Sequence, residues 1–211
     1  MGRAIDQSGI QFRVLNQSKG PAVRGPRAQA DRKLYRKAVF KLLSLQENLI
    51  MQAGSAESLL FDKEDNLIGL KTSSGMELSA PKIIITTGTF LRGIIHIGED
   101  KFPAGRVNEA PSLGLSSTFL RLGFRLGRLK TGTPPRLDGK TIDWSSLVEQ
   151  PGDDVPQPFS YLTKKITTQQ ISCYITETTK ETHTLISANL DRAPLYSGQI
   201  QGMGPRYCPS I

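Results

Sequence analysis

The feature that most constrains the fold is a continuous apolar run, Ile83-Ile84-Ile85, within residues 82–86. Strands buried on both faces of a parallel sheet read as unbroken apolar runs, so this segment predicts such a strand. The run leads into Thr87 and Gly88, where the missing Cβ of glycine lets a ligand approach the backbone. An ordinary exit from a strand into a loop explains this glycine equally well. The sequence therefore predicts an α/β fold, with a ligand site at Thr87 and Gly88 as one hypothesis.

Hydrophobic periodicity predicts helices on both sides of this run. Apolar residues recur at spacings of three and four over residues 28–43, which indicates an amphipathic helix that starts after Pro26. A second helix is expected from an N-cap at Ser112 to about Leu122, before Gly123 stops it. A third is expected over residues 179–190.

Short segments rich in β-formers, separated by turn residues, predict an antiparallel meander within residues 49–80. Its expected strands are Leu49–Ala53, Ser55–Phe61, Leu67–Thr72 and Met76–Ser79. A further strand is expected at Ile171–Thr176. The composition changes beyond Pro135, where a proline-rich loop follows, so we expect a domain transition near residue 135.

Positive charge is concentrated near the start of the chain. The net charge is +8, and residues 1–47 hold ten Lys and Arg against three acidic residues, which leaves +7 in that segment. Such a concentration is typical of a nucleic-acid partner, although a solvated helix face explains it equally well. Candidate phosphate contacts within the segment are Arg24, Arg27, Arg32 and Arg36.

The two cysteines, Cys173 and Cys208, form no Cys-x-x-Cys pair, so neither a disulfide scaffold nor a zinc site is expected. Both histidines are isolated, and no metal site is expected. Cys208 lies two residues from Arg206, and a neighbouring cation lowers the pKa of a thiol. Cys173 has apolar neighbours, which are typical of an inert structural cysteine. No apolar run is long enough to span a membrane, and a reducing, cytosol-like compartment is expected.

Two long motifs are too irregular to be core. Gly127-Arg-Leu-Lys-Thr-Gly-Thr-Pro-Pro-Arg136 exposes backbone amides among cations, and its Lys130 and Arg136 are further candidate phosphate contacts. Gly204-Pro-Arg-Tyr-Cys-Pro-Ser-Ile211 presents a cysteine on a loop stiffened by proline. Together with Lys19–Arg24 and Thr87–Leu91, these motifs resemble the MnmG (GidA) family of flavin-dependent tRNA wobble-uridine modification enzymes.

The resemblance covers nearly the whole chain and implies a central part of such an enzyme. It implies a partial FAD-binding Rossmann-type domain of the glutathione-reductase-like kind over residues 1–135, with the meander at 49–80 inserted. Residues 136–211 would be part of a second, inserted α/β domain that faces NAD and tRNA. No Gly-x-Gly-x-x-Gly is present in the sequence, so the flavin assignment depends on the resemblance.

The resemblance also implies a reaction. The family adds an aminomethyl or carboxymethylaminomethyl group to carbon five of the wobble uridine, with FAD as cofactor, NADH as hydride source and methylenetetrahydrofolate as one-carbon donor. It acts as a homodimer with an MnmE-type GTPase on tRNA, in the cytoplasm or an organellar matrix. Cys208 would be the catalytic cysteine. Ala56, Thr87, Gly88 and Ser112 would contact FAD, and Gly204, Pro205, Arg206 and Tyr207 would contact NAD.

Three observations keep other interpretations open. Without the resemblance, Ala56 reads as a small strand residue and Ser112 as an ordinary N-cap. Glu177 stands where the family usually has histidine, so no role for that histidine carries over. The alternatives are a folate- and FAD-dependent tRNA uridine methyltransferase and an inactive RNA-binding remnant. The Gly127–Arg136 motif favours the MnmG family over the methyltransferase.

Overall fold

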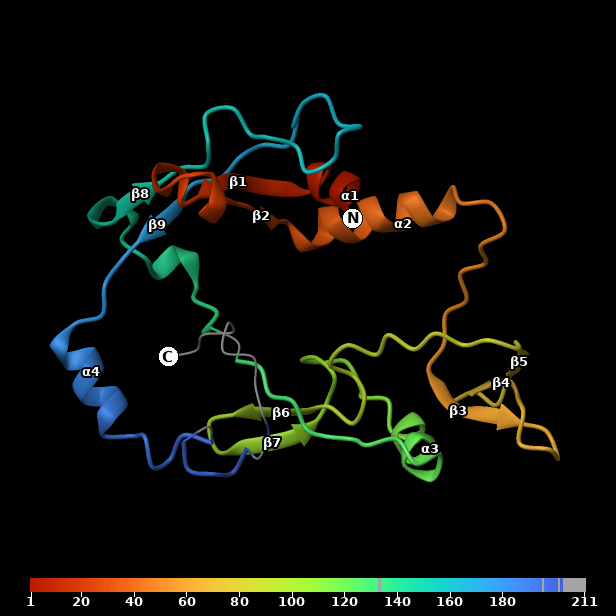
Figure 1. The fold of residues 1–211 in the computed structure, drawn as a ribbon. Coiled ribbons are helices and arrows are strands. Elements are labelled where there is room, and N and C mark those ends of the chain that lie inside the picture. The colour runs from red at the N-terminus through yellow and green to blue at the C-terminus, as the bar shows by residue number, and fades with distance from the viewer. Residues whose placement is uncertain (133, 195, 201, 203–211) are drawn as a thin grey trace. The chain divides into compact units, whose positions relative to one another are not determined.

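The structure is a computed structural model that describes residues 1–132, 134–194, 196–200 and 202. Figure 1 traces its elements, and the contacts among them group the chain into two units. Unit 1 comprises Met1–Met51 and Leu137–Glu177, and unit 2 comprises Gln52–Arg136 and Thr178–Ile211. One division lies close to the expected transition near residue 135, whereas the division after Met51 has no counterpart in the sequence-based boundaries. The assignment of either region to a cofactor domain stays a prediction.

A two-stranded antiparallel sheet organises unit 1. Its strands are β1 (Gly9–Leu15) and β2 (Gly25–Ala30), and the helices α1 (Gly2–Asp6) and α2 (Arg32–Ser44) contact each other beside it (Figure 1). A second antiparallel pair is formed by β8 (Val148–Gln150) and β9 (Cys173–Ile175). Unit 1 also contains four 3₁₀ turns, at Gln17–Lys19, Pro21–Val23, Gly139–Thr141 and Trp144–Ser146.

The segment between β8 and β9 runs along the outer edge of β1. The backbone N–H of Asp153 donates to Phe12 O at 2.8 Å, and that of Ile171 donates to Ile10 O at 2.7 Å. The Asp153 carboxylate also accepts a hydrogen bond from Val14 N at 2.9 Å. Because these bonds occupy backbone groups that an edge strand would otherwise leave unpaired, they join the two sequence-distant parts of unit 1.

Helix α2 begins later than the periodicity predicted. The Asp31 carboxylate accepts a hydrogen bond from Leu34 N at 2.8 Å and caps the helix, so the expected start after Pro26 is wrong. Pro26 instead lies in β2 opposite Val14. Both strands of a two-stranded sheet are edges, where proline is tolerated. The helix buries Ala38, whereas Leu34, expected on the same face, is 41% exposed.

The antiparallel meander is confirmed for three of its four expected strands. In unit 2, β3 (Ala56–Phe61), β4 (Leu67–Thr72) and β5 (Glu77–Ser79) pair in this order. Residues 49–53 form no strand. A carboxylate organises the turn between β3 and β4: the Asn66 side chain, and then backbone N–H groups, donate to Asp62 and hold its pKa below the ordinary value.

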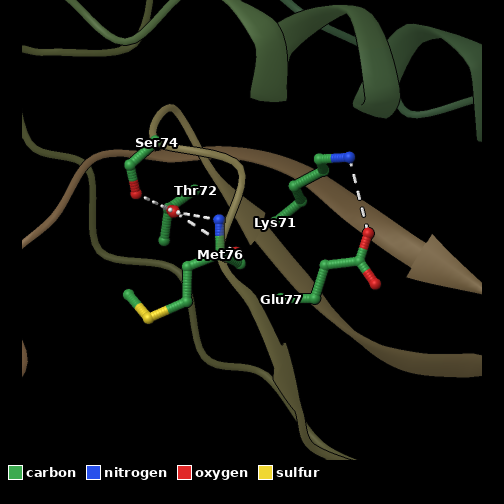
Figure 2. Close-up of polar contacts among 5 residues, drawn as sticks. All are labelled: Lys71, Thr72, Ser74, Met76 and Glu77. Carbon is green, nitrogen blue, oxygen red and sulfur yellow. Dashed lines mark hydrogen bonds and ion pairs between the residues drawn. The ribbon is translucent and has the colours of Figure 1, made fainter.

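The turn between β4 and β5 is closed by a buried hydroxyl (Figure 2). Thr72 Oγ1 lies 3.2 Å from both Met76 N and Met76 O, and 2.9 Å from Ser74 Oγ. Gly75 supplies the left-handed conformation that the turn requires, with φ +87°. An ion pair between Lys71 and Glu77, at 3.4 Å, lies across the strands just outside the turn. The turn residues expected between these two strands, Ser73-Ser74-Gly75, therefore do form a turn.

The described residues of unit 2 form one further hairpin and two short helices. The hairpin, which periodicity did not predict, consists of β6 (Ile94–Ile97) and β7 (Asp100–Pro103). Helix α3 (Gly114–Arg121) ends before Gly123 in the left-handed conformation, φ +78°, as expected. Helix α4 (Lys180–Ser187) is capped by Thr179, whose hydroxyl accepts from Thr182 N. The expected helix over 179–190 is thus confirmed, three residues shorter at its end.

The parallel strand expected at residues 82–86 is not formed, and this expectation is wrong. All strands within the described residues pair antiparallel, and none of them pairs with this run. Ile84 is 91% exposed. An apolar run becomes a strand only when a neighbour supplies hydrogen bonds. The fold class is α/β in the coarse sense of short helices with small antiparallel sheets.

Candidate cofactor-binding site

Two of the predicted cofactor contacts meet in unit 2. Ser112 Oγ donates a hydrogen bond to Ala56 O at 3.1 Å, which joins the loop before α3 to the first residue of β3. The Ser112 backbone is held as well, because its N–H donates to Phe90 O and its carbonyl accepts from Arg92 N, both at 2.8 Å. We call the group of Ala56, Phe90, Leu91, Arg92 and Ser112 the Ser112 junction.

The other two predicted contacts adjoin this junction. Phe90 N donates to Thr87 O at 3.1 Å, so the Thr87-Gly88 turn leads directly into it. Gly88 has φ +57°, and a Cβ built on it would meet nothing within 4 Å. Its backbone is therefore unobstructed on the side where other residues carry a side chain. Hydrogen bonds through Phe90 thus connect three of the four residues, Ala56, Thr87 and Ser112, and Gly88 is the chain neighbour of Thr87.

Close packing between α3 and β3 supports the junction. A Cβ on Gly114 would lie 2.3 Å from Glu57 O and 2.2 Å from Glu57 Oε1, so only glycine fits there without movement. At the C-terminal end of the same helix, Arg121 makes a cation–π contact with β3: its guanidinium lies 5.7 Å from the centre of the Phe61 ring. No pattern in the sequence points to Glu57 or Gly114, because their contact joins residues far apart in the chain.

Ser112 does not act as the helix N-cap that the sequence predicted. Helix α3 begins at Gly114 with Leu113 in the cap position, and no side chain caps it. The Ser112 proton is donated to Ala56 O, so its hydroxyl has only acceptor capacity left. The Glu57 carboxylate lies beside the start of the helix. This arrangement suits a ligand N–H or O–H, such as an adenine or ribose group, and disfavours a phosphate at Ser112.

The Gly127–Arg136 motif is connected to the junction through Arg128. Its guanidinium donates to Arg92 O at 2.9 Å, and Arg92 N in turn bonds Ser112 O. Gly202, two residues before the Gly204–Ile211 motif, also packs on Arg128, since a Cβ there would lie 2.7 Å from Arg128 O. In the sequence, Arg128 is one of the cations of this motif, and no local pattern links it to Ser112.

The candidate phosphate contacts fall in both units. In unit 1, Arg24 and Arg27 lie at the β1–β2 hairpin, and Arg32 and Arg36 follow one another by a turn on α2; all four are exposed. Arg24 Nε also donates to Gln17 O at 3.0 Å. In unit 2, Lys130 is half-buried and Arg136 is exposed.

The predicted catalytic and NAD-binding residues, Cys208 with Gly204, Pro205, Arg206 and Tyr207, lie outside the described residues. Cys173 lies on β9 and is half-buried. Its thiol accepts from Gln29 Nε2 at 3.1 Å and donates to Gln11 Oε1 at 3.3 Å, so its surroundings are more polar than the sequence suggested.

Across the part of the chain that the structure describes, no group of three or more His, Cys, Asp or Glu side chains could hold a metal ion. None of the helices in that part has the length and apolar character that crossing a membrane requires.

The whole chain matches known proteins. The family model described as glucose inhibited division protein A matches residues 1–211. The tRNA uridine 5-carboxymethylaminomethyl modification enzyme MnmG of Thermodesulfovibrio yellowstonii is 55% identical over 211 residues, which cover 100% of this chain and 34% of that protein. The enzyme of the same name from Granulibacter bethesdensis is 54% identical over 213 residues, again 100% and 34%.

Solved structures agree with this match. GidA from Aquifex aeolicus, in its form I crystal, superposes with a TM-score of 0.88 at 46% identity and covers 100% of this chain and 36% of that one. The form II crystal gives 0.85 at 43% identity. The chain thus spans about a third of the length of the relatives it matches.

Proposed function

Because the chain belongs to the glucose inhibited division protein A family over residues 1–211, we propose that it works as part of a flavin-dependent enzyme that modifies the wobble uridine of tRNA. The observation that carries this proposal is the 55% identity over the whole chain to an enzyme named for tRNA uridine 5-carboxymethylaminomethyl modification. Its expected partners are tRNA, a GTPase of the MnmE type and a second copy of the flavoprotein, with NADH and methylenetetrahydrofolate as further reactants.

The Ser112 junction supports FAD as the cofactor. Gly88 offers an open backbone, and Ser112 with Ala56 offers hydrogen-bond acceptors beside it. These residues would hold the periphery of a dinucleotide within a Rossmann-type domain, because the glycine fingerprint that holds a pyrophosphate is not in this sequence. When bound, FAD would supply the redox chemistry of the reaction.

Cys208 would make carbon five of uridine reactive. Carbon five of free uridine is a poor nucleophile. Addition of the Cys208 thiolate to carbon six breaks the carbon five–carbon six double bond and leaves an enolate, whose carbon five can attack an electrophilic one-carbon unit. Loss of the proton from carbon five and expulsion of the thiolate then restore the ring and the enzyme. Arg206 would favour the thiolate form by lowering the pKa of Cys208.

A chimera tests this proposal. The matching third of the T. yellowstonii enzyme is replaced by this chain, and the chimera is produced in cells that lack their own enzyme. Cys208→Ser should reduce 5-carboxymethylaminomethyluridine in tRNA to background with flavin content unchanged, because a hydroxyl is a far weaker nucleophile than a thiolate. Cys173→Ser should leave most of the modification, because serine keeps the hydrogen bonds to Gln11 and Gln29.

The nucleosides are measured by mass spectrometry of hydrolysed tRNA. Unchanged modification with Cys208→Ser, or a loss confined to Cys173→Ser, would show that the reactive thiol has been assigned to the wrong cysteine.

A further inference from the structure

A loop of unit 1 presents an aromatic side chain to solvent. Tyr161 is fully exposed, and its neighbour Leu162 is 79% exposed. Both lie in the turn that follows Phe159 and Ser160, within the long segment between β8 and β9. No residue named in the proposed function lies in this loop.

Buried contacts fix the base of the loop. The Asp6 carboxylate is 3% exposed and accepts from Phe159 N at 2.7 Å and from Ser160 N at 3.0 Å. The Phe159 ring packs 6.1 Å from the buried Phe12 ring. Thr163 N donates to Ser160 O at 2.9 Å and closes the turn that carries Tyr161. The backbone that carries Tyr161 is therefore held on both sides, so part of the cost of ordering this loop is already met before any ligand arrives.

The residues that follow Tyr161 in the chain are positively charged or carry hydrogen-bonding side chains. Lys164 and Lys165 follow it closely and are exposed, and residues 155–176 contain no Asp or Glu. Threonine and glutamine make up much of the following stretch, residues 167–170. The cores of protein–protein interfaces are depleted in lysine, whereas single-stranded nucleic acids bind where an aromatic ring lies beside positive charge.

We propose that Tyr161 is a stacking platform for an unpaired base of the tRNA substrate, with Lys164 and Lys165 contacting the adjacent phosphates. The choice of tRNA rests on the proposed function, but the stacking itself rests on the exposed ring and its anchored loop. Recognition of RNA loops depends on bases that are turned out of the helix and stacked on aromatic side chains. A base that is to be modified at carbon five must be unpaired in the same way.

Binding of the chimera to an anticodon stem-loop RNA, compared with a fully paired duplex of equal length, tests this assignment. Tyr161→Ala should weaken stem-loop binding by about fivefold or more and leave duplex binding unchanged. Tyr161→Phe keeps the ring and should bind as the unchanged chimera does. Tyr196→Ala removes another exposed tyrosine, on unit 2, and should have no effect. Lys164→Gln with Lys165→Gln should lower the slope of log Kd against log salt by roughly 0.7 for each phosphate that the lysines neutralise.

The controls separate this inference from the proposed function. Stem-loop binding that is unchanged in Tyr161→Ala overturns the stacking inference, even where the chimera still modifies tRNA. An equal loss for stem-loop and duplex, or a loss accompanied by a changed oligomeric mass, also overturns it, because the loop would then hold the fold or a second copy together. A chimera that binds the stem-loop through Tyr161 and makes no modified uridine contradicts the proposed function alone.

Discussion

Gly114 lies where α3 begins and leaves no room for a side chain against Glu57. Gly114→Ala should lower the free energy of unfolding by about 1–3 kcal/mol, because the added Cβ meets the Glu57 carbonyl, which belongs to the backbone of β3 and cannot turn away. Gly127→Ala is the matched control in the same unit, since nothing lies within 4 Å of its added Cβ. Denaturant unfolding of the two chimera variants measures the difference.

Equal stability of the two glycine variants would show that the packing of α3 on β3 is loose.

Single residues can be predicted from the sequence where their role depends on neighbouring residues. The helix end before Gly123 was predicted correctly, because a helix end of this kind is set by neighbouring residues. Ser112 was wrongly predicted as a helix N-cap. Its hydroxyl instead donates to Ala56 O, and no local sequence pattern links these two residues.

Helix α2 and the β1–β2 hairpin carry the concentrated positive charge of unit 1. Replacing Arg24, Arg27, Arg32 and Arg36 by Gln should weaken tRNA binding and flatten its salt dependence, by roughly 0.7–0.9 in the log–log slope for each phosphate that these arginines neutralise. Replacing Arg3, Arg13, Lys19 and Lys41 by Gln removes equal charge from the same segment. A slope that stays the same in the first variant means that the charge acts only as a solvated face. A slope that falls equally in both variants means that the positive charge of the whole segment, and not these four arginines in particular, contacts phosphates.

The elements themselves were predictable where their stabilising contacts are local. The meander was confirmed because its strands are consecutive and its turns carry Asp62, Asn66 and Gly75. The apolar run at 82–86 was misread, because a parallel strand depends on neighbours that its own residues do not specify. The β6–β7 hairpin was not predicted because its strands are four residues long and do not alternate between buried and exposed side chains, which is the pattern that marks a strand.

A further prediction concerns FAD binding by the whole chain. Expressed by itself, the 211-residue chain should bind FAD poorly, because the Ser112 junction would contact only the periphery of a dinucleotide and the sequence lacks the pyrophosphate fingerprint. The visible absorption of the desalted protein measures the flavin that remains, with the chimera as the positive control. A yellow protein with one flavin per chain would contradict this prediction.

The domain assignments, the NAD contacts and the role of Cys208 stay predictions that depend on family resemblance. Sequence similarity over the whole chain identifies the family, but it does not place a cofactor. What the structure adds is that hydrogen bonds through Phe90 connect Ala56, Thr87 and Ser112, with Gly88 next to Thr87 in the chain and Arg128 bonded to Arg92 O.

The most direct test of the central claim is the amount of 5-carboxymethylaminomethyluridine in tRNA from cells that lack their own enzyme and produce the unaltered chimera. If this chain is a working part of a tRNA wobble-uridine modification enzyme, the chimera restores the nucleoside to a level comparable with that of the intact T. yellowstonii enzyme. A chimera that is folded, binds flavin and tRNA, and yields no modified uridine would contradict the account.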